Sequence, residues 1–285
     1  MFRSSVLRRA VTGVTVTLMM VTGVPSANAG AASVTASSGS LTARFTYTGS
    51  FPQAKNPRLV ISEAGKVLYD EPVSSKWCGH RCWPLALIPH AKVLNVVHLQ
   101  SSGPASVVLG LYSGGAHCCS IEQVFSLGAG SSTIEKAEYD FGDPGVRLVP
   151  IGPGGSFEFL SENSVFAYAF TDYAASGMPI KILSFSHNQF NDVTRSFATL
   201  VARDATRWLK AFNLMARSHY QDSVGLVAAW AADEEMLGHS SIVSSFLAKE
   251  AAAGHLNSAL SPEEPSGHRF VAALEKFLHR YGYLK

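Results

Sequence analysis

The sequence predicts an α+β protein, in which an antiparallel, β-rich domain over residues 30–198 precedes an α-helical domain over residues 199–285. In the first domain, short β-branched and aromatic runs alternate with clusters of Gly, Pro, Ser and Asn, which is the pattern of strands and turns. In the second, apolar residues recur at helical spacing between polar caps and glycines. A run of strands followed by a run of helices is typical of the α+β class.

Residues 1–29 have the three parts of a secretory signal peptide. Three arginines precede an apolar stretch over residues 10–24, and small residues lead to Ala29. The stretch is shorter than the roughly 18 apolar residues that a membrane-spanning helix needs. We therefore expect cleavage after Ala29, a secreted or extracytoplasmic protein, and no integral membrane segment after signal cleavage.

Cleavage also changes the charge of the chain. The full sequence has 23 basic and 21 acidic residues, and the removed segment contains three arginines and no acid, so the mature chain has a net charge of −1. With this balance we expect no strongly basic surface and no nucleic-acid partner. Hydrophobic residues make up 47% of the sequence and charged residues 15%, which indicates a packed globular protein rather than a disordered one.

The strand pattern extends from about residue 33 to residue 197, and ten segments exemplify it. They are residues 41–48, 58–62, 66–69, 93–99, 106–112, 121–127, 146–151, 157–160, 165–170 and 180–185. Residues 93–112 and 146–168 share a layout of strand, loop and strand, with an offset of 52 residues that aligns Gly103 with Gly155. The period of propeller blades is similar, about 40–50 residues. The sequence therefore allows either a propeller-like sheet or a sandwich.

Four helices are predicted after residue 203. Asp204 is a candidate N-cap for the first helix, which carries Trp208 and Phe212 on its apolar stripe. Each of the other three has a polar residue before its stripe and a glycine after it. The second begins at Asp222 or Ser223 and ends at Gly238, and the other two cover residues 240–254 and 266–282.

All four cysteines lie within 42 residues, as Cys78 and Cys82 and then Cys118 and Cys119. In an exported chain an even number of cysteines favours disulfides, and two bridges allow three connectivities. Bridges from the first two cysteines to the last two would close loops of about 40 residues and contribute roughly 3–4 kcal/mol in the chain-entropy model. Bridges between sequence neighbours would instead suggest a redox or conformational role. We expect structural cross-links, with the connectivity open.

A metal site is an alternative use of the same region. Cys78, His80, Cys82 and His117 offer ligand atoms that zinc accepts. The adjacent cysteines after His117, however, would point to opposite faces of a strand, so both can hardly bind one ion. We expect no metal and no cofactor.

The run Gly114-Gly-Ala-His-Cys-Cys119 resembles the hallmark of a group of uncharacterised secreted bacterial proteins, common in actinobacteria. In that group, strands often follow Asp-x-Asp-Gly-Asp-Gly loops similar to those of FG-GAP or integrin-like repeats, which bind calcium through clustered carboxylates. The corresponding loops here, residues 98–106 and 150–158, keep two glycines and Glu158 but no aspartate. The resemblance implies a propeller-like fold, and we expect degenerate loops without calcium.

These observations lead to a functional hypothesis. We expect a secreted, noncatalytic binding or envelope-associated protein whose partner is an extracellular protein, peptide or glycan. The alternative is a cell-envelope hydrolase or thiol-redox enzyme in which His117 is the base and Cys118 or Cys119 the nucleophile. The aromatic run over residues 165–170 is a further candidate surface, but its alternation at strand period favours burial of the rings.

Overall fold

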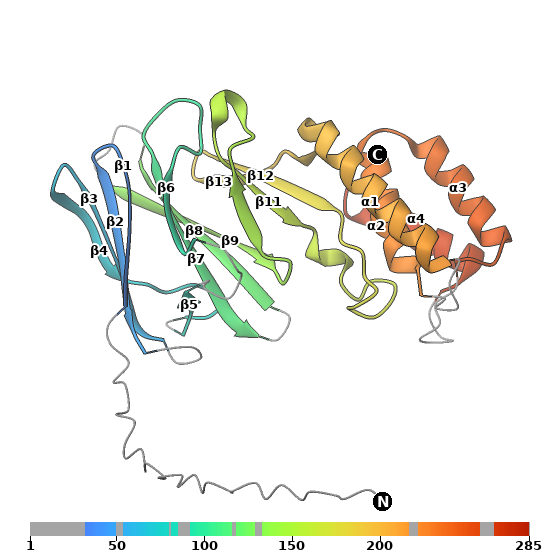
Figure 1. The fold of residues 1–285 in the computed structure, drawn as a ribbon, viewed down its shortest axis with the longest axis horizontal. Helices are drawn as coiled ribbons and strands as arrows, with labels where there is room; N and C mark the ends of the chain where they lie inside the picture. Colours follow the sequence, from blue (N-terminus) through green and yellow to red (C-terminus); the bar gives the residue numbers. More distant parts are fainter. Residues whose placement is uncertain are drawn as a thin grey trace, which may run out of the picture.

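The computed structural model describes residues 32–49, 54–79, 81–84, 92–115, 118–128, 133–216, 222–256 and 265–284. The predicted signal peptide, His80 and His117 lie outside the described residues. Three antiparallel sheets precede four helices, which confirms the α+β class. In Figure 1 the sheets follow one another across the molecule, and the helices lie beyond the third sheet. None of the described helices is long and apolar enough to cross a membrane.

The first sheet is a four-stranded meander. Its strands are β1 (Ala32–Ser38), β2 (Leu41–Thr48), β3 (Lys55–Glu63) and β4 (Lys66–Pro72). Two-residue turns close two of its hairpins, and Gly39 and Gly65 take the positive φ angles of 58° and 82° that such turns favour. Ala43, Phe45 and Ile61 alternate with more exposed residues and point into the core.

The second and third sheets continue the antiparallel order. The second contains β5 (Trp83–Pro84), β6 (Leu94–Val97), β7 (Ser106–Gly115), β8 (Cys118–Leu127) and β9 (Ile134–Gly142). The third contains β10 (Val146–Val149), β11 (Glu158–Glu162), β12 (Ile180–Ser186) and β13 (Gln189–Asp192). Both β5 and β6 pair with β7, so the second sheet has five strands and the third has four.

A structural repeat links these two sheets. Val97 of β6 pairs with Ser106 of β7, and Val149 of β10 pairs with Glu158 of β11, which is the same register 52 residues further on. In each case a further antiparallel hairpin follows. The offset of 52 residues predicted from the sequence therefore separates two strand pairs with the same arrangement and register.

The second sheet is covered on both faces. Val107 and Leu109 of β7 belong to the core shared with the first sheet. Val108, between them, belongs to the core shared with the third sheet, where it joins Phe159 and Leu183. A strand with both faces buried needs apolar residues at successive positions, which explains the continuous apolar run in β7.

The helical part contains α1 (Ala198–Ala216), α2 (Val224–Met236), α3 (Ser240–Ala252) and α4 (Gly267–Arg280). Helix α2 is buried along most of its length and shares a core with the other three helices. Because α2 is surrounded, its sequence is apolar on nearly every side until Asp233. Phe212, Trp230 and Phe270 are the large side chains of this core.

The interpretation of Asp204 as an N-cap is wrong. Helix α1 begins at Ala198, so Asp204 lies in its second turn. Its carboxylate accepts hydrogen bonds from the main-chain nitrogen of Ile180 at 2.9 Å and from Nε1 of Trp208 at 3.0 Å. The residue therefore fastens the helix to the third sheet instead of starting the helix.

The prediction of a strand over residues 165–170 is also wrong. The chain forms a 3₁₀ helix at Ser164–Phe166 and then turns. Phe166 and Phe170 lie four residues apart and enter the helical core, where both rings pack edge-on against Phe277. Tyr168 has a positive φ of 59° and is 59% exposed. Burial therefore holds for the two phenylalanines and not for the tyrosine.

Candidate binding pocket

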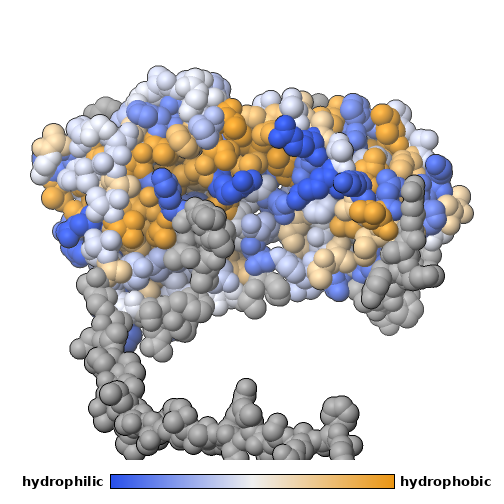
Figure 2. All heavy atoms as spheres, viewed as in Figure 1, coloured by the Kyte–Doolittle hydropathy of each residue, from blue (hydrophilic) through white to orange (hydrophobic). Residues whose placement is uncertain are grey.

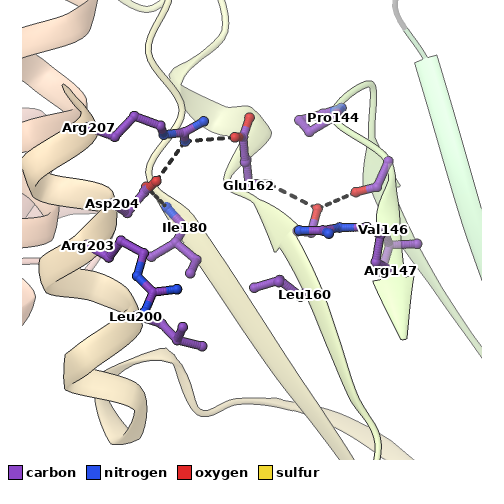
Figure 3. Close-up of a pocket in the computed structure, with 12 residues that line it drawn as sticks. Pro144, Val146, Arg147, Leu160, Glu162, Ile180, Leu200, Arg203, Asp204 and Arg207 are labelled. Atoms are coloured by element: carbon purple, nitrogen blue, oxygen red, sulfur yellow. Dashed lines mark hydrogen bonds and ion pairs between the residues drawn. The ribbon is translucent and has the colours of Figure 1, made fainter. Parts of the chain in front are cut away.

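A pocket of about 480 Å³ lies where the third sheet meets α1 (Figure 3). Leu160 of β11 and its cross-strand partner Arg147 of β10 present the same face of the sheet to it. Four residues of α1 line it, and each lies three or four positions from two of the others, so they share one side of the helix; they are Leu200, Arg203, Asp204 and Arg207. The volume lies within the range of sites for small organic molecules, roughly 300–1,000 Å³.

Part of the lining is apolar. Leu160, Ile180 and Leu200 are each half-buried, and Val146 beside them is buried. Apolar surface that a ligand removes from water contributes about 25 cal/mol per Å² to binding. The three half-buried side chains therefore form a floor that favours an apolar group.

One wall is held by a network of ion pairs. A terminal nitrogen of Arg207 lies 2.9 Å from Oε1 of Glu162 and 2.7 Å from Oδ1 of Asp204. Figure 3 shows this guanidinium between the two carboxylates, one from β11 and one from its own helix. Together with the hydrogen bonds of Asp204 to Ile180 and Trp208, these contacts join α1 to β11 and β12. The wall is thus built from groups that already have partners.

Arg147 and Arg203 differ from Arg207. Within the part of the chain that the structure describes, neither forms an ion pair with an acidic residue. In Figure 3 their guanidinium groups extend toward the pocket from opposite walls, with Leu160 between them. Figure 2 shows hydrophilic residues gathered where the strands give way to the helices. Three guanidinium groups against two carboxylates leave the pocket one net positive charge, which favours an anion.

A buried acid lies behind the Asp204 wall. Asp233 of α2 is fully buried, and neither of its carboxyl oxygens has a hydrogen-bond partner among the described residues. Burial, followed by the neighbouring Asp204 carboxylate, raises the pKa of Asp233 to about 10. The side chain is therefore neutral at pH 7, which avoids the cost of burying an unpaired charge.

Two smaller cavities are less suited to a ligand. One of about 280 Å³ lies beside Arg195, whose guanidinium already donates to four main-chain carbonyls. The other, of about 390 Å³, lies between α3 and α4 and is lined by Val243, Leu247 and Leu274, with serines at its edge. In neither does the described lining place an arginine without an acidic or carbonyl partner beside an apolar floor, as the pocket beside α1 does.

The structure brings the cysteines together as sequence neighbours. Cys78 is bonded to Cys82, and Cys118 to Cys119, so all four are in disulfides. Cys78 and Cys82 are therefore not free thiolates for zinc, and neither of the other two is a free nucleophile. The argument that adjacent cysteines point to opposite faces is wrong here, because their sulfurs are joined to each other. One carboxylate oxygen of Asp140 lies within 4.8 Å of both sulfurs.

The loop that resembles a calcium loop has one acid. Glu158 is buried, and a Cβ on Gly152 would lie 2.1 Å from its Oε1, so the carboxyl fills the space above that glycine. Burial raises the pKa of Glu158 to about 7, against the lowering effect of its hydrogen bond with Ser156. The geometry shows a carboxyl packed into its own loop.

Sequence reasoning missed the charged lining of the pocket. It noticed Asp204, as a cap, and it did not single out Arg147, Arg203 or Arg207. One signal was available, because Asp204 and Arg207 are three positions apart at the start of the predicted helix, a spacing at which opposite charges meet. The strand partners of that side are set by the topology, which local patterns do not reveal.

No protein-family model matches the chain, and no solved structure is significantly similar to it. Two curated proteins are distant relatives. Uncharacterized protein y4bJ of Sinorhizobium fredii is 26% identical over 188 residues, which are 65% of this chain and 28% of that protein. The probable thylakoid lumen protein sll0997 of Synechocystis sp. is 25% identical over 150 residues, which are 51% of this chain and 44% of that protein. The chain thus spans less than half the length of either relative.

Proposed function

We propose that this chain is an extracytoplasmic, noncatalytic binding protein and that its ligand is a small organic molecule in the pocket between the third sheet and α1. The observation that carries the proposal is the apolar floor of Leu160, Ile180 and Leu200 inside a cavity of about 480 Å³. Arg207 is bound to both Glu162 and Asp204, and these ion pairs hold the wall in place. A preformed cavity with a fixed wall binds without the cost of ordering it first.

Three features support the compartment. Residues 1–29 have the composition of an export signal. The four cysteines form two disulfides, which persist in oxidising compartments. One distant relative has a name that assigns it to the thylakoid lumen, which lies outside the cytoplasm.

Binding of an uncharged apolar probe tests the function without presupposing a charge on the ligand. We expect N-phenyl-1-naphthylamine to bind the exported, mature protein at one saturable site, detected by its fluorescence. In Leu160→Trp and Leu200→Trp a larger side chain, from β11 or from α1, occupies part of the cavity. Each should weaken binding of the probe at least about tenfold. Leu214→Trp is the matched control, because Leu214 lies on the same helix α1 and is 66% exposed.

The proposal fails if both filled variants, folded by circular dichroism, bind the probe as tightly as the parent protein. It also fails if the probe shows no saturable binding to the parent protein. Loss of binding in Leu214→Trp as well would show that the probe reports a general change in the helices and would equally contradict the pocket.

A thiol-redox activity at Cys118 and Cys119 is the second candidate. The observation in its favour is the local pairing, because a bridge between sequence neighbours closes a minimal loop and adds little chain-entropy stabilisation. In this activity two thiol groups of the reductant reduce the bridge, giving two protein thiols and the disulfide of the reductant, and the two protein thiols then reduce a substrate disulfide to two thiols while the bridge re-forms. Reduction of insulin disulfides in the presence of dithiothreitol tests it. Cys118→Ser/Cys119→Ser should lose a measurable rate that Cys78→Ser/Cys82→Ser retains, and equal rates in all three proteins would contradict it.

A further inference from the structure

We infer that the pocket binds an amphipathic acid, with a carboxylate or phosphate head between Arg147 and Arg203 and an apolar body on Leu160 and its neighbours. This inference rests on the proposed function and adds the chemical class of the ligand. It starts from the difference between the arginines of the pocket, since Arg207 has two carboxylate partners and the other two have none among the described residues.

The two arginines come from separate elements. Arg147 stands on β10 and Arg203 on α1, and both guanidinium groups extend toward the same space (Figure 3). Two cations that face each other repel, and an anion between them removes that repulsion. Guanidinium groups also match the paired oxygens of carboxylates and phosphates, to which they donate parallel hydrogen bonds. The arrangement therefore selects a negatively charged head.

The two acids of the pocket are not free to bind a cationic ligand. Glu162 and Asp204 are both bound to Arg207, and Asp204 accepts two further hydrogen bonds. A cationic ligand would have to displace Arg207 from one of them, whereas an anion meets two arginines without such partners. The electrostatics therefore favour an acid over an amine or a zwitterion.

The floor specifies the rest of the ligand. Leu160 is the cross-strand partner of Arg147, so the apolar surface begins directly beside one guanidinium. Ile180 and Leu200 extend it toward the helix. Inorganic phosphate would satisfy the arginines and leave this surface in water, whereas an acid with an apolar body covers both.

Isothermal titration calorimetry on the mature protein tests the inference. The probes are octanoate, octyl phosphate, 1-octanol and inorganic phosphate, which vary the head and the body separately. We expect octanoate or octyl phosphate to bind at one site, at least about tenfold more tightly than 1-octanol or inorganic phosphate. Whichever of these two acids binds more tightly shows whether the pocket prefers a carboxylate or a phosphate head group. Arg147→Ala and Arg203→Ala should each weaken the acid at least about tenfold and leave 1-octanol unchanged.

Arg44→Ala is the matched control, because Arg44 is an exposed arginine of β2 in the first sheet. It should bind the acids as the parent protein does. The inference is overturned if 1-octanol binds as tightly as the acids, if inorganic phosphate does so, or if both pocket variants bind the acids unchanged. If 1-octanol binds tightly and Leu160→Trp abolishes that binding, the inference of an acidic ligand is contradicted while the proposed function is still supported. Failure of the inference can therefore be distinguished from failure of the proposed function.

Discussion

The guanidinium of Arg195 donates a hydrogen bond of 2.7 Å to the main-chain carbonyl of Tyr283, 88 residues further along the chain. The same side chain donates to the carbonyls of Gly282, Glu235 and Met236 at 3.0–3.2 Å. Glu235 and Met236 are the last residues of α2, and Gly282 and Tyr283 directly follow the end of α4, so the guanidinium lies at two helix C-termini, where the helix dipole is negative. One arginine, placed just before α1, therefore caps two other helices.

Removing this cap should destabilise the helical part. We expect Arg195→Ala to lower the free energy of unfolding by about 2 kcal/mol, because several charge-assisted hydrogen bonds and a favourable dipole interaction are lost at a partly exposed site. Arg195→Lys should recover part of the loss through its charge. Urea denaturation measures both, with Arg269→Ala, an exposed arginine of α4, as the control. A loss in Arg195→Ala no larger than in the control would refute the capping role.

The buried carboxyl of Asp233 predicts a pH dependence. Its pKa is about 10 in the folded protein, against an ordinary value of 3.8. Between these values the folded chain keeps a proton that the unfolded chain releases, so this group lowers stability progressively as pH rises from about 4 to 10. The charged groups that act on it are Asp204 and Glu234, which raise its pKa, and Arg207, which lowers it.

Asp233→Asn removes this titration and keeps the shape of the side chain. The stability of the variant relative to the parent protein should therefore increase between pH 5 and pH 8, by at least about 1 kcal/mol. Comparing urea denaturation of the two proteins at each pH cancels the other titrating groups. Ser241→Ala, at an exposed position of α3, replaces no titratable group and is the control, so its difference from the parent protein should not change with pH. A pH-independent difference for Asp233→Asn would show that the carboxyl is not held neutral.

The local pairing of the cysteines predicts a modest effect of their removal. The bridges join residues four positions apart and one position apart, so each closes a short loop. We expect Cys78→Ser/Cys82→Ser and Cys118→Ser/Cys119→Ser each to cost at most about 2 kcal/mol, below the 3–4 kcal/mol of a long-range bridge. Mass spectrometry of nonreduced peptides checks the connectivity. A peptide that joins Cys78 or Cys82 to Cys118 or Cys119 would contradict the pairing.

Local patterns predicted much of the architecture. Three of the four helices begin and end close to their predicted caps and glycines, because those signals act within a few residues. The ten predicted segments leave out β1, β5, β9 and β13, and two of these have weak signals. β9 (Ile134–Gly142) carries several charges at the edge of its sheet, and β13 (Gln189–Asp192) has only four residues. The error at residues 165–170 has a tertiary cause, since Phe166 and Phe170 are drawn into the helical core.

The pocket could not be predicted from local sequence patterns. Arg147 and Arg203 are 56 positions apart in the sequence and meet only because β10 pairs with β11 while α1 packs on the same face of that sheet. Asp204 looked like a cap because its bond to the main-chain nitrogen of Ile180, 24 positions away in the sequence, depends on the same packing. The composition indicated an exported globular protein but carried no information about which charges would converge.

The junction between the helices and the third sheet also contains a contact that only glycine permits. Gly225 lies in the first turn of α2, and a Cβ there would lie 2.4 Å from the carbonyl oxygen of Ala175 and 2.8 Å from Cγ2 of Thr171. The oxygen belongs to the backbone and cannot rotate away. Thr171 is itself fixed, because its hydroxyl donates to the buried Asp222 carboxylate at 2.6 Å.

Gly225→Ala should therefore destabilise the protein by about 1–3 kcal/mol, the usual cost of overpacking. The sign of this change in the free energy of unfolding tests the close contact, because replacing glycine by alanine in an unobstructed helix stabilises the protein by up to about 1 kcal/mol. Thr171→Ser removes Cγ2 and keeps the hydroxyl, so the double variant should recover part of the loss in a urea-denaturation cycle. Ser241→Ala, at an exposed position of α3, is the helix control. If Gly225→Ala proves as stable as the parent protein, α2 does not approach the 171–175 segment this closely.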